Sequence, residues 1–262
     1  MNNAEITKSN KRLVDDVLDR VATMSDEEFK SLADSMVRFY NYSTYNQILL
    51  YFSNCSQVAS FKKWKELGRT IKKGGKATWI LAPKILSKKV ENEKGEEEKK
   101  DILTGFISVP VFDISQTEGK EIERNMATKS DIKLDDLKNS VKRLGYDISS
   151  KALEISKGGY ICEKEIVLNS NLNEIENTAT LIHELCHGEL GHTNAENEKS
   201  RMQKEQEAEL TTYIVCKFFG IERKSEFYLK SWQLTENIMQ SFLLINKVAT
   251  KIIKEINVSL NQ

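Results

Sequence analysis

Histidine and glutamate side chains at helical spacing form the most distinctive pattern in this sequence. His183, Glu184 and His187 make an HExxH pattern, and with His192 the stretch 181–192 holds all three histidines of the chain. Side chains four positions apart lie on one face of an α-helix, so the two imidazoles of HExxH can bind the same metal ion. Glu184 is then placed to take a proton from water at that metal. The pattern predicts a zinc site with Glu184 as its general base.

A hydrolytic zinc site needs a third protein ligand beside the two histidines. On a continuous helix, His192 would point about 140° away from His187, and its spacing differs from the HExxHxxGxxH pattern of metzincins. The alternative is a glutamate of the EQEAEL segment, which follows in a second predicted helix. We expect Glu205 to be the ligand and Glu209, one turn further on, to orient a ligand histidine. Glu209 or Glu207 is the fallback ligand, and Glu207 is otherwise expected on a solvated face.

Two other roles at this site stay open. His192 either contacts substrate from the rim of a cleft or is a polar residue beyond the end of the helix. A group that stabilises the developing oxyanion is also expected, and the candidates are Tyr160, Tyr213, Tyr228 and His192. Peptide hydrolysis is the reaction that this set of residues suits best, with Glu184 passing a proton from water to the leaving amine.

Helices must hold these ligands, and capping signals locate the ends of those helices. The HExxH helix is expected to begin near Asn173, because asparagine is a good N-cap residue. The other elements predicted in this half are a helix over 134–144, two short strands (one from Tyr146, one from Tyr160 running on to Leu168), a helix over about 199–219 and a long segment over about 227–256.

Composition excludes several classes of protein. The 262 residues include 39 basic and 39 acidic side chains, so net charge says nothing about partners. No apolar run approaches the ~20 residues that cross a bilayer, and the N-terminus has no apolar signal core. Four cysteines without a CxxC pattern indicate neither a disulfide framework nor a cysteine zinc site. We therefore expect a cytoplasmic protein with no membrane contact.

The first half of the chain has a different character. Seven basic residues and one acidic residue lie between positions 61 and 76, and aromatic residues occur on both sides of them. Cations that follow a phosphate backbone, with rings that stack on bases, are what single-strand binding requires. The alternative is an ordinary basic surface over a core that contains the rings. The charged segment 91–100, predicted as the tip of a long hairpin, would repel a nearby nucleic acid strand.

Several motifs resemble a known family. Residues 42–50 (YSTYNQILL), 71–76 (IKKGGK) and 111–117 (VFDISQT) resemble the N-terminal, single-stranded-DNA-binding domain of ArdC-type antirestriction proteins. The second half, with HExxH, the EQEAE segment and residues 228–232 (YLKSW), resembles the zincin metallopeptidase domain of the same proteins and is similar to ImmA/IrrE-type metallopeptidases. ArdC members tend to have Trp-Thr-Gly-His directly after HExxH, whereas the spacing to His192 is one residue longer. The resemblance implies an antirestriction protein of a mobile genetic element.

Residues and resemblance together predict an α+β protein with two domains. Residues 1–118 would form a helical, small-sheet domain that binds single-stranded DNA, and residues 131–262 a mostly helical zincin-like domain with a short β-sheet. Two alternatives remain: an ImmA/IrrE-type regulatory metalloprotease that cleaves a repressor, and a DNA-binding module with a purely structural zinc. The side chains expected to contact DNA are Tyr42, Asn46, Lys62, Lys63, Trp64, Arg69, Lys72, Lys73, Lys76 and Trp79.

Overall fold

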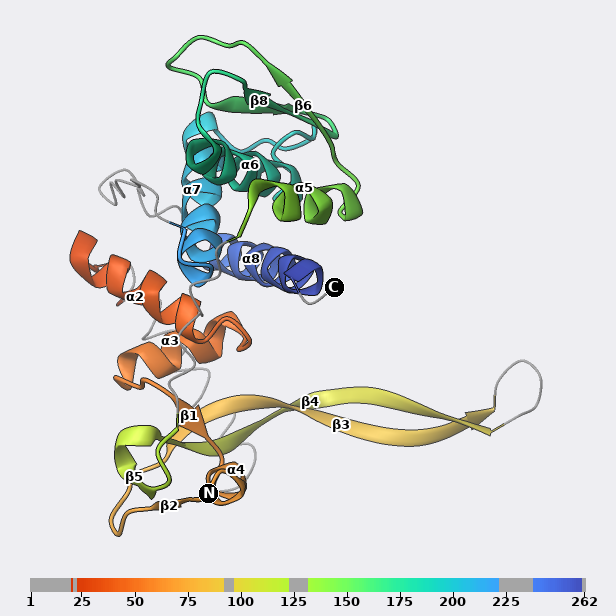
Figure 1. Ribbon diagram of the computed structural model, residues 1–262. Coiled ribbons are helices and arrows are strands. Elements are labelled where there is room, and N and C mark those ends of the chain that lie inside the picture. The colour runs from red at the N-terminus through yellow and green to blue at the C-terminus, as the bar shows by residue number, and fades with distance from the viewer. Residues whose placement is uncertain (1–19, 21–22, 92–96, 123–131, 222–237, 261–262) are drawn as a thin grey trace. The chain divides into compact units, whose positions relative to one another are not determined.

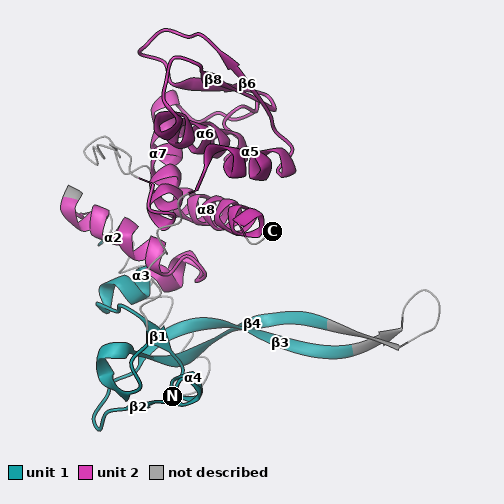
Figure 2. Cartoon of the chain, viewed as in Figure 1, with its two compact units in different colours: residues 1–21, 48–123 teal, residues 22–47, 124–262 magenta. Residues whose placement is uncertain are grey.

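The computed structural model describes residues 20, 23–91, 97–122, 132–221 and 238–260. Contacts divide the chain into two compact units, which Figure 2 shows in different colours. Unit 1 comprises residues 1–21 and 48–123, and unit 2 comprises residues 22–47 and 124–262. The predicted division into domains 1–118 and 131–262 stays a prediction.

The HExxH segment of unit 2 lies on helix α6 (Glu174–Glu189), whose start is fixed by a capping box. The Asn173 side chain accepts the backbone N–H of Glu176, and the Glu176 side chain accepts the N–H of Asn173. This confirms the predicted start of the helix. Its apolar face is fully buried, with Leu181, Ile182 and Leu185 in the core of the unit.

Helix α7 (Arg201–Phe218) carries the acidic segment and contacts both α6 and helix α8 (Ile238–Leu260) (Figure 1). Ser200 caps α7 and accepts the backbone N–H of Gln203. The helix predicted over about 199–219 is thus confirmed. Helix α5 (Leu134–Arg143) packs against α8 and α6 and completes this group.

A three-stranded sheet with the order β6-β8-β7 lies against α6. Strand β8 (Glu165–Asn169) is central, with β6 (Asp147–Lys151) parallel to it and β7 (Gly159–Cys162) antiparallel to it. The single strand predicted from Tyr160 to Leu168 is therefore two strands. The chain reverses between them at Glu163, whose φ of 51° is incompatible with a continuous strand.

Unit 2 also includes residues from the first half of the sequence. Helix α2 (Asp26–Arg38) begins with a capping box formed by Ser25 and Glu28, and it packs on α7. The Phe29 and Phe242 ring centroids are 5.7 Å apart, which joins α2 to α8 as well. Through these contacts an N-terminal helix becomes part of the core that supports the HExxH helix.

The YSTYNQ motif continues this attachment. Helix α3 (Thr44–Phe52) contains the boundary between the units, after Gln47. Within unit 2, the Gln47 Nε2 atom donates to Asn246 Oδ1 at 2.8 Å, and the Asn246 amide donates to the carbonyl oxygen of Tyr42 at 3.2 Å. The motif thus serves to fasten its segment to α8.

Unit 1 is built around a long antiparallel hairpin formed by β3 (Thr78–Glu91) and β4 (Glu97–Asp113). The hairpin confirms the predicted strand pair, and the residues 92–96 between the strands lie outside the described part. The remaining elements are β1 (Val58–Ala59), which pairs with the end of β4; helix α4 (Phe61–Glu66); β2 (Arg69–Ile71), which pairs with β5 (Thr117–Gly119); and a short 3₁₀ turn, η1 (Ile114–Gln116).

A buried carboxylate holds the base of the hairpin. Asp113 accepts the backbone N–H groups of Ser56, Gln57 and Ser115 at 2.6, 3.0 and 2.9 Å. Burial acts to raise the pKa of Asp113, but these hydrogen bonds lower it more, so the pKa lies below its usual value. Asp113 thereby joins the loop before β1 to the start of η1.

The described residues form an α+β fold, helical in unit 2 with small sheets in both units, which confirms the predicted fold class. Among them, no helix combines the length and the apolar character that a bilayer crossing requires.

Candidate metal centre

Three predicted ligands converge at one point of unit 2. The Nε2 atoms of His183 and His187 are 3.2 Å apart, and Glu205 Oε2 lies 3.7 Å from the first and 3.5 Å from the second. Among the described residues, this is the group of histidine, cysteine and acidic side chains able to hold a metal ion. The spacing on α6 and the packing of α7 against α6 bring the three together.

The donor triangle fits a zinc ion. Tetrahedral Zn²⁺ with bonds of about 2.0–2.1 Å places its ligand atoms about 3.3–3.4 Å from one another. The three observed separations of 3.2, 3.7 and 3.5 Å surround this value without any rearrangement of the helices. Two imidazoles and one carboxylate are also a ligand set found at catalytic zinc sites, where a fourth position is left for water.

Glu205 is held as an anion by its neighbours. Contacts with His183 and with His187 lower the pKa of the Glu205 carboxyl well below its usual range, although burial acts in the opposite direction. A metal ligand must be deprotonated, so this environment suits metal binding.

The second ring nitrogen of His183 faces away from the metal position. Its Nδ1 atom lies 3.5 Å from Glu209 Oε1 and 3.4 Å from the Thr212 hydroxyl. Glu209 is therefore where the prediction placed it, beside a ligand histidine and one turn beyond Glu205. Such a partner fixes the tautomer that leaves Nε2 free to bind metal.

The triangle opens into a cleft of about 1140 Å³. Glu184 lines this cleft together with edge strand β7 and the first turn of α7. Strand β7 lies close to α6 because it starts with glycine: a Cβ atom on Gly159 would meet Val167 O at 2.7 Å and Thr180 Cγ2 at 2.9 Å. Because Gly159 has no side chain, the edge strand β7 can lie close to the HExxH helix.

His192 folds back onto the helix that precedes it. Helix α6 ends at Leu190, and Gly191 adopts a φ of +72°, which glycine allows. The backbone N–H of His192 then donates to the His187 carbonyl oxygen at 3.0 Å, as in a Schellman turn. The expectation that His192 points away from His187 was wrong, because it assumed that the helix continues.

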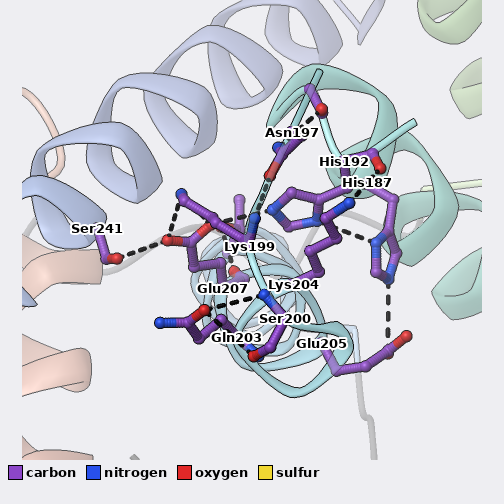
Figure 3. A network of polar contacts seen from close by, with 12 residues as sticks. His187, His192, Asn197, Lys199, Ser200, Gln203, Lys204, Glu205, Glu207 and Ser241 are labelled. Carbon is purple, nitrogen blue, oxygen red and sulfur yellow. Dashed lines mark hydrogen bonds and ion pairs between the residues drawn. The ribbon is translucent and has the colours of Figure 1, made fainter. Parts of the chain in front are cut away.

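Glu207 is buried, with only 2% of its surface exposed, which corrects the expectation of a solvated acidic face. Its oxygens accept hydrogen bonds from Lys199 Nζ at 2.7 Å, from His192 Nε2 at 3.0 Å and from the Ser241 hydroxyl at 2.5 Å (Figure 3). These donors outweigh the effect of burial and lower the pKa of Glu207 to about 2. A sequence signal existed, because Glu207 shares helical spacing with buried Leu210 and Ile214.

The candidates for oxyanion stabilisation are dispersed. Tyr160 lines the cleft, whereas the Tyr213 hydroxyl is hydrogen-bonded to Asp34 and Lys217. Both ring nitrogens of His192 are engaged with His187 and Glu207. Tyr228, like residues 228–232 of the family motif, lies outside the described residues. Tyr160 is the candidate that the geometry leaves at the cleft.

The residues predicted to contact DNA divide into two groups. Trp64 is fully buried and donates its ring N–H to the Phe112 carbonyl, and Asn46 is 5% exposed, so neither can reach a nucleic acid. These two predictions are corrected, because both side chains are buried. Tyr42 is half-buried, with its ring edge-on to Phe39.

The cationic residues are mostly at the surface of unit 1. The Arg69 guanidinium is committed to Thr117 and to the Lys120 carbonyl, and Lys72 Nζ donates to the Ser115 carbonyl at 3.0 Å. Trp79 is 53% exposed on the hairpin. The exposed lysines of the predicted set are Lys62, Lys63, Lys72, Lys73 and Lys76.

Comparison with known families decides what kind of protein this is. Residues 7–112 match the N-terminal domain of anti-restriction factor ArdC, and residues 132–215 match the IrrE N-terminal-like domain of the M78 peptidases. The two matches together support an ArdC-type protein. The resemblance read from the motifs is thereby confirmed, and this ArdC-type chain carries a metallopeptidase-like second domain.

Individual relatives of the ArdC-type chain are distant. The uncharacterized protein pXO2-81 of Bacillus anthracis is 26% identical over 98% of this chain and 53% of its own length, so the chain spans about half of that relative. Among solved structures, the metal-free antirestriction ArdC protein from plasmid R388 aligns with a TM-score of 0.49 at 22% identity, over 84% of each chain. The Mn(II)-bound structure of the same protein aligns with a TM-score of 0.45 at 20% identity, again over 84% of each chain.

Proposed function

We propose that unit 2 is a zinc metallopeptidase domain in which His183, His187 and Glu205 hold the metal and Glu184 is the general base. The observation that carries this proposal is the donor triangle with sides of 3.2, 3.7 and 3.5 Å, at the wall of a cleft that Glu184 also lines. When bound there, zinc would lower the pKa of water to around 7 and polarise a carbonyl group.

The chain's own residues supply the other requirements of peptide hydrolysis. Glu184 takes a proton from the attacking water and returns it to the leaving amine. Glu209 and Thr212 keep His183 oriented through its Nδ1 atom. Strand β7 is an edge strand of its sheet and borders the cleft, so an extended peptide can pair with its backbone and present a bond beside Glu184.

Replacing Glu184 by glutamine tests this proposal, because it removes the base and leaves all three ligands. The assay is cleavage of a fluorescence-quenched peptide library by the zinc-loaded chain, with metal content measured in parallel. We expect cleavage to fall by at least about 10²-fold at unchanged zinc content. The exposed residue Glu196, changed to glutamine, is the control. Undiminished cleavage by Glu184→Gln would contradict the role of Glu184 as general base. A zinc-loaded wild type that cleaves nothing would contradict peptidase activity and favour a structural zinc.

For unit 1 the proposed ligand is single-stranded DNA. The supporting observations are the match to the ArdC N-terminal domain, the exposed lysines on α4 and on the loop 72–76, and the exposed Trp79 ring. The loop is held in place because the Gln116 side chain accepts the backbone N–H of Lys76 at 2.6 Å. Amines fixed near an exposed ring can follow a phosphate backbone while a base stacks on the ring.

The two activities together would serve antirestriction, the role that the name of the family carries. A mobility-shift assay with single-stranded and double-stranded DNA at several salt concentrations tests the DNA-binding part. If about four lysines contact phosphates, log K should fall with log[salt] with a slope of about −3 for a single strand. Lack of binding, or binding that salt does not weaken, would contradict it and leave the repressor-cleaving metalloprotease as the better account.

A further inference from the structure

A continuous hydrogen-bonded chain connects a buried carboxylate to the ligand His187. His192 Nδ1 lies 3.0 Å from His187 Nδ1, and His192 Nε2 lies 3.0 Å from Glu207 Oε2. Figure 3 shows the sequence Glu207, His192 and His187, with Glu205 on the far side of His187. His192 is 8% exposed, so solvent does not replace these contacts.

Glu207 determines which atom is the donor in each hydrogen bond between Glu207, His192 and His187. A carboxylate can only accept, so His192 Nε2 must carry the hydrogen that faces it. A neutral imidazole with hydrogen on Nε2 has a lone pair on Nδ1, and an imidazole is neutral at pH values well above about 6.5. The Nδ1 of His192 therefore accepts, and His187 Nδ1 must donate. That leaves the lone pair of His187 on Nε2. This atom lies 3.2 Å from His183 Nε2 and 3.5 Å from Glu205 Oε2, and the second distance is beyond the usual range of an N–H···O hydrogen bond.

Glu207 is itself anchored from two other segments of unit 2. Lys199 comes from the loop before α7 and reaches both carboxylate oxygens at 2.7 Å, while Ser241 comes from α8. Glu207 lies on α7, two positions after Glu205. The buried charge is thus compensated by a lysine and fixed in direction by neutral donors, which is the condition under which a buried carboxylate is tolerated.

We propose that His192 and Glu207 are positioning residues that preset the tautomer and ring orientation of His187 before any metal arrives. This assignment rests on the proposed metal site and deepens it, because it gives the second histidine a partner equivalent to the one Glu209 gives the first. His192 also lines the cleft, but in this role it acts on His187 and not on water or substrate. Its effect passes through His187, and removing it should weaken metal binding.

The tautomers can be measured in the metal-free chain. Its three histidines all lie at this site, so nitrogen NMR of uniformly labelled protein at about pH 8, where neutral imidazole predominates, gives three ring spectra. We expect hydrogen on Nδ1 of His187 and on Nε2 of His192. Glu207→Gln should remove this preference, since an amide can donate as well as accept. The opposite tautomers in the wild type would overturn the proposal even if the chain never bound zinc.

Metal affinity is the second readout, measured by chelator competition with Zn²⁺ alone. His192→Leu removes the acceptor and should lower zinc affinity about 10- to 100-fold. His192→Asn keeps an acceptor oxygen near the position of Nδ1 and should recover part of that loss. The exposed Glu196→Gln is the matched control.

The assignment holds only if His192→Leu lowers the zinc affinity of the folded protein and does not merely lower the stability of the metal-free chain. If His192→Leu lowered the stability of the metal-free chain but left the zinc affinity of the folded protein unchanged, His192 would be a packing residue only. If the wild type bound no zinc while its tautomers were as expected, the proposed metal site would fail and the preset tautomer would stand.

Discussion

The metal centre of unit 2 and the hairpin of unit 1 present their side chains in opposite ways. At the metal centre, polar groups are buried or half-buried, each bonded to the next, and they converge on one point from α6 and α7. On the hairpin, large apolar side chains such as Trp79 and Phe106 are more than half exposed and lie along one face of two strands. The centre can therefore act only through fixed geometry, whereas the hairpin can accept a flexible ligand.

The difference shows what a substitution should do in each region. Removing a buried side chain leaves its hydrogen-bond partners unsatisfied or leaves a cavity in the core. Either change destabilises the fold. An exposed ring that is removed changes stability little and changes binding to whatever stacks on it. Three substitutions in unit 1 separate these effects, from the largest expected change to the smallest.

Trp64→Ala should have the largest effect, although Trp64 was predicted to bind DNA. The ring is fully buried and its N–H donates to the Phe112 carbonyl at 2.8 Å. Loss of such a ring costs about 3–5 kcal/mol. Hydrogen exchange of the β4 amides should accelerate by about 10²-fold or more, while the amides of α6 in unit 2 keep their rates. Unchanged exchange in β4 would mean that Trp64 does not hold unit 1 together.

Asp113→Asn should have an intermediate effect that depends on pH. The carboxylate accepts three backbone N–H groups, and replacing a charged acceptor by a neutral one costs about 1–3 kcal/mol. Because the folded-state pKa of Asp113 lies below its usual value, its contribution is present at neutral pH and is lost as pH falls below about 4. Urea unfolding of both proteins should show a gap at pH 7 that narrows at pH 3. A gap independent of pH would contradict the role of the charge.

Trp79→Ala should leave stability within about 0.5 kcal/mol, since the ring is 53% exposed. Affinity for a single-stranded oligonucleotide should fall by about 1–3 kcal/mol if a base stacks on this ring. Fluorescence anisotropy with a labelled oligonucleotide measures the change. Ile155→Ala, an exposed apolar residue of unit 2, is the control. Equal affinity of the Trp79 variant and the control would remove the hairpin from the DNA-binding surface.

The convergence of His183, His187 and Glu205 could be predicted from the sequence because helical spacing carries geometry. His183 and His187 share a face by periodicity, and the capping residue Asn173 marks where that helix begins. The position of His192 was not predicted, because Gly191 adopts a left-handed conformation that ends the helix and reverses the direction of the chain. The burial of Glu207 was not predicted, because the acidic residues around it indicated a solvated face although Glu207 shares its helical core spacing with Leu210.

The residues expected to contact DNA were predicted less well, because residue type alone does not show which aromatic side chains are exposed. Lysines are exposed almost wherever they occur, so those assignments required little information. Aromatic rings are equally at home in a core and on a binding surface, and spacing did not separate Trp64 from Trp79. Trp79 lies on a strand whose register pairs it with Pro110, whereas Trp64 lies on α4, which packs against β1 and β4. Both arrangements depend on contacts between residues far apart in the sequence.

The turn that ends α6 has one further consequence. His192 is tied to His187 twice, by its backbone N–H to the carbonyl oxygen and by one imidazole to the other. A loop of different length after the second histidine would break both links at once. Insertions or deletions between positions 187 and 192 should therefore be far more damaging than equally large changes within residues 193–196, which are exposed.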